Sequence, residues 1–115
     1  MLFQTYTPGG VDIRRPRITR SGRIRVTETL IRRTSPDRVL ELGAGDYSFD
    51  YCQEKRPGRT WVKVDFVAPC DLLCDFNTPN VAIPAEASSF DCIVCTEVIE
   101  HILWPHALLR ECHRL

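Results

Sequence analysis

The chain has 115 residues, of which 43% are hydrophobic and 26% charged, a composition typical of one soluble globular domain rather than a disordered chain. Fifteen basic and fifteen acidic side chains cancel, so the molecule as a whole has no net charge that would attract nucleic acid or an anionic membrane. No apolar run approaches the ~20 residues that cross a bilayer, and the N-terminus lacks the apolar core of a signal peptide. We therefore expect a cytoplasmic protein without a membrane partner.

The N-terminal part of the chain is basic. Residues 1–23 contain proline and glycine at five positions and follow no period of 2 or 3.6, which predicts an irregular leader. A solvated terminus is one interpretation of this arm, and an anionic partner or substrate, RNA included, is the other. Nine arginines precede position 40: Arg14, Arg15, Arg17, Arg20, Arg23, Arg25, Arg32, Arg33 and Arg38.

Strands and helices then alternate along the chain. Apolar spacing predicts helices over residues 24–33, 48–55 and 97–115, the last one kinked or divided by Pro105. Apolar runs bounded by turn residues predict strands over residues 38–42, 61–65, 71–75 and 90–95. This order predicts an α/β fold with an open parallel sheet.

Open parallel sheets bind ligands at the carboxyl ends of their strands. The predicted strands end at Gly43, Asp65, Asp75 and the run 95–97, so we expect these positions to meet along one edge of the sheet.

The segment 39–46 delivers a strand directly into a glycine turn. Gly43 and Gly45 let the backbone approach a ligand, whereas the charge of Glu41 inside a buried strand requires donors from a ligand amine or from nearby backbone. Asp65 ends the next strand, where it would accept hydrogen bonds from the hydroxyls of a ribose. Together these features favour a nucleoside-type ligand. A turn without a ligand, with Asp65 as a cap, is the alternative.

A family resemblance joins these motifs. Residues 37–115 resemble class I S-adenosylmethionine-dependent methyltransferases of the type 11 and ubiquinone-biosynthesis kind. The similarity is carried by ELGAGD, VD, CDF, SFDCIV and CTEVIEH, and by Pro105, Leu108, Leu109, Glu111 and Arg114. It implies a Rossmann-like sheet that is truncated after its fourth strand and the following helix.

The resemblance also implies a cofactor, S-adenosyl-L-methionine, and a set of contacts to it. Tyr47 departs from the family, which has a third glycine at this position. The implied contacts are Glu41, Gly43, Ala44, Gly45 and Thr96 with the methionine portion, Asp65 with the ribose, and Asp75 and Phe76 with the adenine.

Glu97, Glu100 and His101 have the spacing that would place them on one face of a helical turn. Two carboxylates and an imidazole suit a divalent metal, and similar EVxEH segments bind one in some members of the family. Helix-start charges beside a packed histidine are the alternative. His101 is also the candidate general base if the methyl acceptor atom is oxygen.

The six cysteines do not predict a metal or disulfide site. Cys92 and Cys95 form a CxxC, but positions three apart on a strand point to opposite faces. We expect free thiols in a reducing compartment.

The function predicted for residues 24–115 is that of a partial S-adenosylmethionine-binding domain of a methyltransferase. The acceptor is expected to be a small molecule, with RNA left open. A non-catalytic remnant of the fold and an NAD-binding oxidoreductase domain are the alternatives, and Ser48 at the last glycine position of the dinucleotide fingerprint counts against the second. Because family members continue beyond Leu115, we expect a fragment or a missing half supplied by a second chain.

Overall fold

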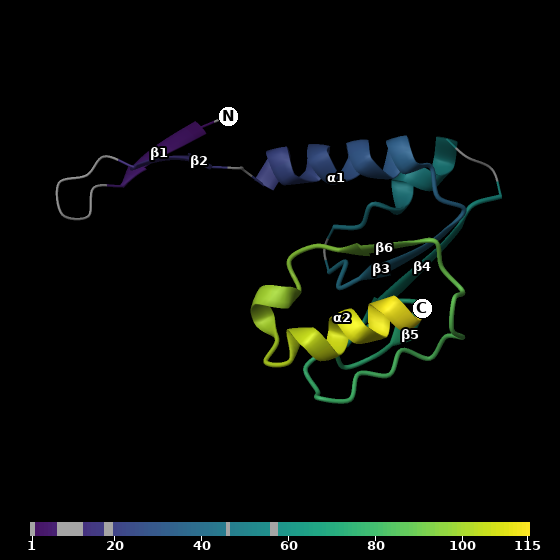
Figure 1. Cartoon of the computed structure of the whole chain (residues 1–115). Helices are drawn as coiled ribbons and strands as arrows, with labels where there is room; N and C mark the ends of the chain where they lie inside the picture. The colour runs from purple at the N-terminus through teal and green to yellow at the C-terminus, as the bar shows by residue number, and fades with distance from the viewer. Residues whose placement is uncertain (1, 7–12, 18–19, 46, 56–57) are drawn as a thin grey trace. The chain divides into compact units, whose positions relative to one another are not determined.

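The computed structural model describes residues 2–6, 13–17, 20–45, 47–55 and 58–115. They fall in two compact units, Met1–Thr34 and Ser35–Leu115. Figure 1 labels the helices and strands along the chain. Among the described residues, no helix combines the length and the apolar character that a membrane span requires.

The first unit contains a hairpin and a helix. Strands β1 (Leu2–Tyr6) and β2 (Ile13–Arg17) pair antiparallel, so the prediction of an irregular leader is wrong for these ten residues. Both strands contain residues that favour extended backbone, among them Phe3, Tyr6 and Ile13. The prediction rested on the lack of a regular period and gave this propensity too little weight. Residues 1, 7–12 and 18–19 of the predicted leader lie outside the described residues.

Helix α1 (Arg20–Thr34) confirms the predicted helix and begins four residues earlier than expected. It ends before Ser35, which has a left-handed φ of 49°, and before Pro36, which cannot continue a helix. The Thr34 hydroxyl donates to the carbonyl oxygen of Leu30 at 2.8 Å within the last turn.

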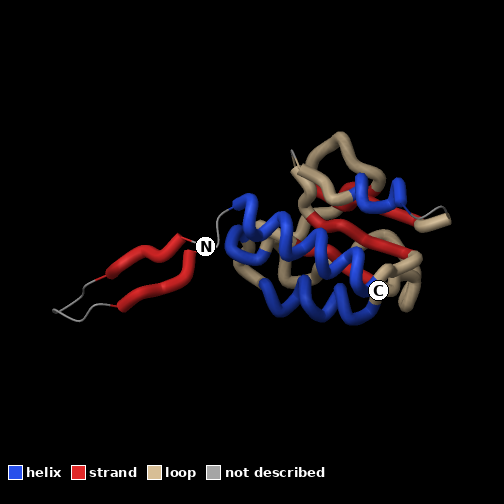
Figure 2. The backbone as a smooth tube through the Cα atoms, turned by 90° about the horizontal axis from the view of Figure 1, so that it is seen from above, coloured by secondary structure: helices blue, strands red, loops and turns tan. Residues whose placement is uncertain are grey.

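The second unit is built on a four-stranded parallel sheet. Its strands are β3 (Arg38–Leu42), β4 (Thr60–Asp65), β5 (Leu72–Leu73) and β6 (Cys92–Cys95), in the spatial order β5-β4-β3-β6. Figure 2 draws the strands in red and the helices in blue. All neighbouring pairs are parallel, which confirms the predicted Rossmann-like α/β fold.

Strand β5 is shorter than the predicted 71–75. The Asp71 carboxylate accepts a hydrogen bond from the backbone N–H of Lys63, and Asp75 turns the chain by accepting one from Asn77. Side-chain hydrogen bonds of aspartate thus replace regular ladder bonds at both ends of this strand, by a contact to β4 at Asp71 and by a local turn at Asp75.

Strand β3 is buried on both faces, as expected for a central parallel strand. Leu40 and Leu42 pack into the main core, which also contains Val64 of β4 and Leu108. By alternation, Val39 and Glu41 face the other side of the sheet.

The predicted helix 97–115 is divided at Pro105. Only Ile99–His101 forms a short 3-10 helix, η3, and helix α2 (Pro105–Arg114) then begins with the proline at its first position. The predicted helix 48–55 is likewise a 3-10 helix, η2 (Asp50–Lys55), because the Ser48 hydroxyl accepts the backbone N–H of Asp50 and holds the chain in a turn.

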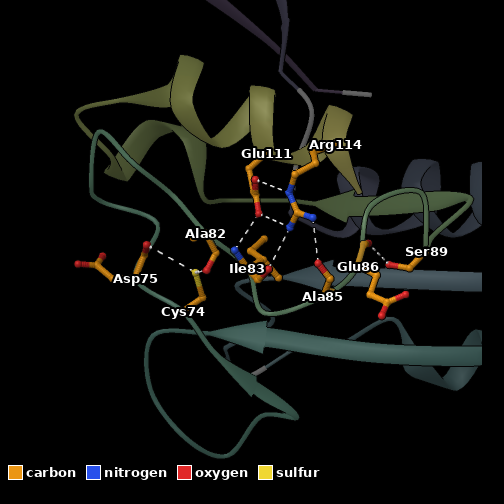
Figure 3. A network of polar contacts seen from close by, with 9 residues as sticks. All are labelled: Cys74, Asp75, Ala82, Ile83, Ala85, Glu86, Ser89, Glu111 and Arg114. Carbon is orange, nitrogen blue, oxygen red and sulfur yellow. Dashed lines mark hydrogen bonds and ion pairs between the residues drawn. The ribbon is translucent and has the colours of Figure 1, made fainter.

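Helix α2 is fastened to the segment that precedes β6 (Figure 3). The buried Glu111 accepts a hydrogen bond from the backbone N–H of Ile83 at 2.8 Å and two from the Arg114 guanidinium, at 2.6 and 2.9 Å. Arg114 also donates to the carbonyl oxygens of Ile83 and Ala85. The Arg114 guanidinium lowers the pKa of the Glu111 carboxyl below its usual range.

We predict that Glu111→Gln destabilises the fold in a pH-dependent way. A carboxyl whose pKa is lowered by folding stabilises the protein above its unfolded pKa of about 4.3, and this contribution is lost as the pH falls through the lower folded pKa. Urea unfolding of wild type and variant should therefore differ most at neutral pH and converge in acid. Glu86→Gln, which changes an exposed carboxylate, is the matched control, and an equal effect of both substitutions would contradict the prediction.

Candidate functional site

The glycine turn after β3 has two differently placed glycines. Gly43 has a φ of 62°, its N–H donates to the carbonyl oxygen of Val64 at 2.8 Å, and a Cβ at this position would lie 2.5 Å from Cγ2 of Val98. Gly45 has a φ of 53°, but a Cβ there would meet no atom within 4 Å. Gly43 is therefore required for packing, whereas Gly45 leaves open space beside the turn.

Glu41, on β3 before the turn, binds the segment that follows the turn. Its side chain is buried, and its carboxylate accepts hydrogen bonds from the Ser48 hydroxyl at 2.6 Å, the Phe49 backbone N–H at 3.0 Å and the Trp61 indole N–H at 2.8 Å. Of the two donor sources expected from the sequence, the structure shows the backbone one and adds two side chains. Glu41 thus connects β3 to β4 and to the segment that follows the turn.

Asp65 joins the end of β4 to the glycine turn. It is buried, and its carboxylate accepts the backbone N–H of Gly45 at 3.3 Å and that of Phe66 at 2.7 Å. Each carboxylate oxygen retains a lone pair for a further hydrogen bond. The structure therefore confirms that Gly43, Gly45 and Asp65 meet at one edge of the sheet.

Asp75 and Phe76, which follow β5, have different environments. Asp75 is exposed, whereas the ring of Phe76 is buried in the core, with Cε2 4.0 Å from the position of a Cβ on Gly43. The structure thus places Phe76 beneath the glycine turn rather than at the surface. Asn77 continues this segment and accepts the backbone N–H of Leu103 at 2.8 Å, which ties it to the stretch between η3 and α2.

A family model described as a methyltransferase domain matches residues 14–115. The chain belongs to this methyltransferase domain family. Searches of curated proteins and of solved structures found no match. The family match confirms the resemblance to methyltransferases that the motifs indicated.

Phe66 is a residue of this methyltransferase domain that the sequence analysis missed. It directly follows Asp65, and its side chain is 72% exposed, next to the similarly exposed Val67. Because the exposed ring directly follows the buried carboxylate in the chain, it is accessible to a ligand at this edge. The signal available in the sequence was an aromatic residue placed directly after the acidic end of a strand.

The segment after β6 does not form the predicted metal-binding face. Glu97 has a left-handed φ of 59° and lies before η3, so it shares no helical turn with Glu100 and His101. Among the described residues, no group of three or more histidine, cysteine, aspartate or glutamate side chains is arranged to hold a metal ion. The metal hypothesis is therefore not supported, because the helix that would have grouped these side chains is absent. His101 is exposed, and Thr96 is half-buried directly after β6.

All six cysteines are free thiols. Cys95 packs against the core, and burial raises the pKa of its thiol to about 11. Because β6 is a regular strand, Cys92 points to the opposite face, as predicted.

A groove lies between α2 and the segment 79–82, away from the glycine turn. It is lined by Pro79, Asn80, Val81, Ala82, Ala107, Arg110, Glu111 and Arg114. Glu111 and Arg114 are already hydrogen-bonded to each other and to backbone groups. These two side chains therefore have a structural role, and the groove is not part of the candidate site at the strand ends.

We predict that the two glycines of the turn differ in their tolerance of a side chain. Gly43→Ala combines left-handed strain with the overlap on Val98 and should destabilise the domain by about 2–4 kcal/mol, whereas Gly45→Ala should cost about 1 kcal/mol from strain alone. Urea unfolding measures both. Val98→Ala in the Gly43→Ala background should recover part of the loss, and purely additive effects would contradict the proposed contact.

Glu41→Gln should destabilise the domain by about 2–3 kcal/mol, because an amide offers one acceptor oxygen to three converging donors. Ser48→Ala removes one donor and leaves the carboxylate, so we expect a loss of about 1 kcal/mol. Equal losses, measured by urea unfolding, would show that the carboxylate is not the centre of this network.

Proposed function

We propose that the chain binds S-adenosyl-L-methionine at the carboxyl edge of its sheet and serves methyl transfer to a small-molecule acceptor. The observation that carries this proposal is the hydrogen bond between the backbone N–H of Gly45 and the carboxylate of Asp65, in a chain that belongs to a methyltransferase family. It brings a glycine turn and an acidic strand end together, which is the arrangement that nucleoside ligands require.

The residues at this edge suit the cofactor. The open space beside Gly45 lets a ligand approach the backbone, and the remaining lone pairs of Asp65 can accept the two hydroxyls of a ribose. The exposed ring of Phe66 offers a flat apolar surface next to that ribose position for the adenine base. When bound, S-adenosyl-L-methionine supplies an electrophilic methyl group on its sulfonium, and the neutral thioether that remains is a good leaving group.

In this proposal the protein acts mainly by positioning, because holding two reactants in line lowers the barrier without covalent help. Glu41 is a positioning residue, since its carboxylate is saturated by donors of the chain itself. Thr96 and Asp75, at the ends of β6 and β5, are proposed to flank the cofactor. His101 is the proposed general base for an oxygen acceptor, and its exposed ring is accessible to one.

The family match does not support the alternative of an NAD-binding oxidoreductase domain. A non-catalytic domain that binds the cofactor without turnover is separated from an enzyme by measurement. The measurement is the conversion of S-adenosyl-L-methionine to S-adenosylhomocysteine, which chromatography detects in the presence of candidate acceptors.

The cofactor site is tested by calorimetric titration of the chain with S-adenosylhomocysteine. Asp65→Asn should weaken binding by about 10- to 100-fold, the effect of losing charge-assisted hydrogen bonds to the ribose. Gly45→Asn should also block binding, because asparagine tolerates the left-handed backbone while its side chain fills the open space. Glu86→Gln, in an exposed loop, is the control. Unchanged affinity of Asp65→Asn in a folded chain would refute the proposed site.

A further inference from the structure

The two compact units of the chain carry opposite charge. Residues 1–34 contain eight arginines and two acidic side chains, Asp12 and Glu28, which gives a net charge of +6. Residues 35–115 contain seven basic and thirteen acidic side chains, which gives −6. The first unit is therefore strongly cationic although the whole chain has no net charge. The electrostatic field of such a unit acts over roughly the Debye length of 8–10 Å.

The cationic residues of this unit are distributed over both of its elements. Arg14, Arg15 and Arg17 lie on β2, in register with Thr5, Gln4 and Leu2 of β1. On α1, Arg25, Arg32 and Arg33 are exposed, and only Arg32 forms a described ion pair, with Glu28. Arginines therefore occur on both β2 and α1.

The chemistry of the unit favours phosphates as the ligand. All of its basic side chains are arginines and none is a lysine. A guanidinium binds a phosphate with two parallel hydrogen bonds and also stacks on a nucleobase, which an ammonium does not do. Phe3 and Tyr6 of β1 add aromatic residues, the side chains on which single-stranded bases stack.

An anionic membrane is a less suitable partner. A helix that lies on a membrane separates an apolar face from a basic one. On α1 the exposed residues Val26 and Leu30 are interspersed with the exposed arginines 25, 32 and 33, so the apolar and basic residues are not segregated.

We propose that strands β1 and β2 and helix α1 form a nucleic-acid-binding arm that recognises the phosphates and bases of single-stranded RNA. The arginines of β2 and α1 contact the phosphate backbone, and binding by this arm is a property separate from cofactor binding at the glycine turn. It is therefore expected to persist in Asp65→Asn and Gly45→Asn, whether or not the proposed cofactor site is correct.

The test is fluorescence anisotropy of a labelled, mixed-sequence RNA of ~20 nucleotides with the full chain at ~50 to ~200 mM salt. The expected result is binding that weakens steeply with salt. Two arginine pairs are changed in separate variants, Arg15→Gln with Arg17→Gln in the hairpin and Arg25→Gln with Arg33→Gln in the helix. Each should weaken binding by on the order of tenfold and reduce the slope of log affinity against log salt by about 1.4, since one phosphate contact on a single strand contributes about 0.7.

Arg38→Gln with Arg110→Gln is the matched control, because it removes two exposed arginines from the second unit. Its affinity should stay within twofold of wild type. The helix pair keeps the test valid if the hairpin variant is poorly folded. The proposal is overturned if the control pair loses as much affinity as the arm pairs, or if the chain does not bind the RNA at ~50 mM salt. Equal binding of polyglutamate, or stronger binding to phosphatidylserine vesicles than to RNA, would also overturn it.

Discussion

The buried carboxylate of Glu41 sets the geometry on which the candidate site depends. A charge inside a central strand is tolerated only when donors surround it, and here three donors come from two places in the chain: Ser48 and Phe49 after the turn, and Trp61 on β4. These contacts hold β4 against β3 and draw the chain back toward the sheet immediately after the turn. The turn itself is thus confined from both of its ends, and its position relative to the end of β4 is fixed.

From this constraint the rest of the edge follows. With β3 and β4 held in register, the amide of Gly45 falls within reach of Asp65, and the next residue, Phe66, is left exposed beside it. On the opposite face of the sheet, Leu40 and Leu42 pack with the residues of α2, and the Glu111–Arg114 pair fastens that helix to the chain before β6. One face of β3 therefore serves the site, and the other serves the core.

The sequence was sufficient to predict the parallel sheet, the glycine turn and the meeting of Gly43 with Asp65 at one edge, because apolar runs and strand-ending residues are local signals. It was insufficient where tertiary contacts decide. Phe76 is buried because it fills the space below Gly43, and the helix expected around Glu97 is absent because the backbone there adopts a left-handed turn beside Val98. Strands β1 and β2 depend on pairing with each other, which periodicity within one strand does not reveal. The roles proposed for Thr96, Asp75 and His101 stay predictions.

The contact between Gly43 and Val98 has a consequence for how the protein is made. The turn is synthesised before the side chain that it packs against, which follows more than fifty residues later in the chain. Until then the growing chain contains Gly43 without the Val98 side chain that packs against it, and β3 lacks its neighbour β6. The edge that contains Gly43 and Asp65 is therefore completed only after Val98 has been synthesised, and until then the unpaired edge of the hydrophobic strand β3 is prone to aggregation.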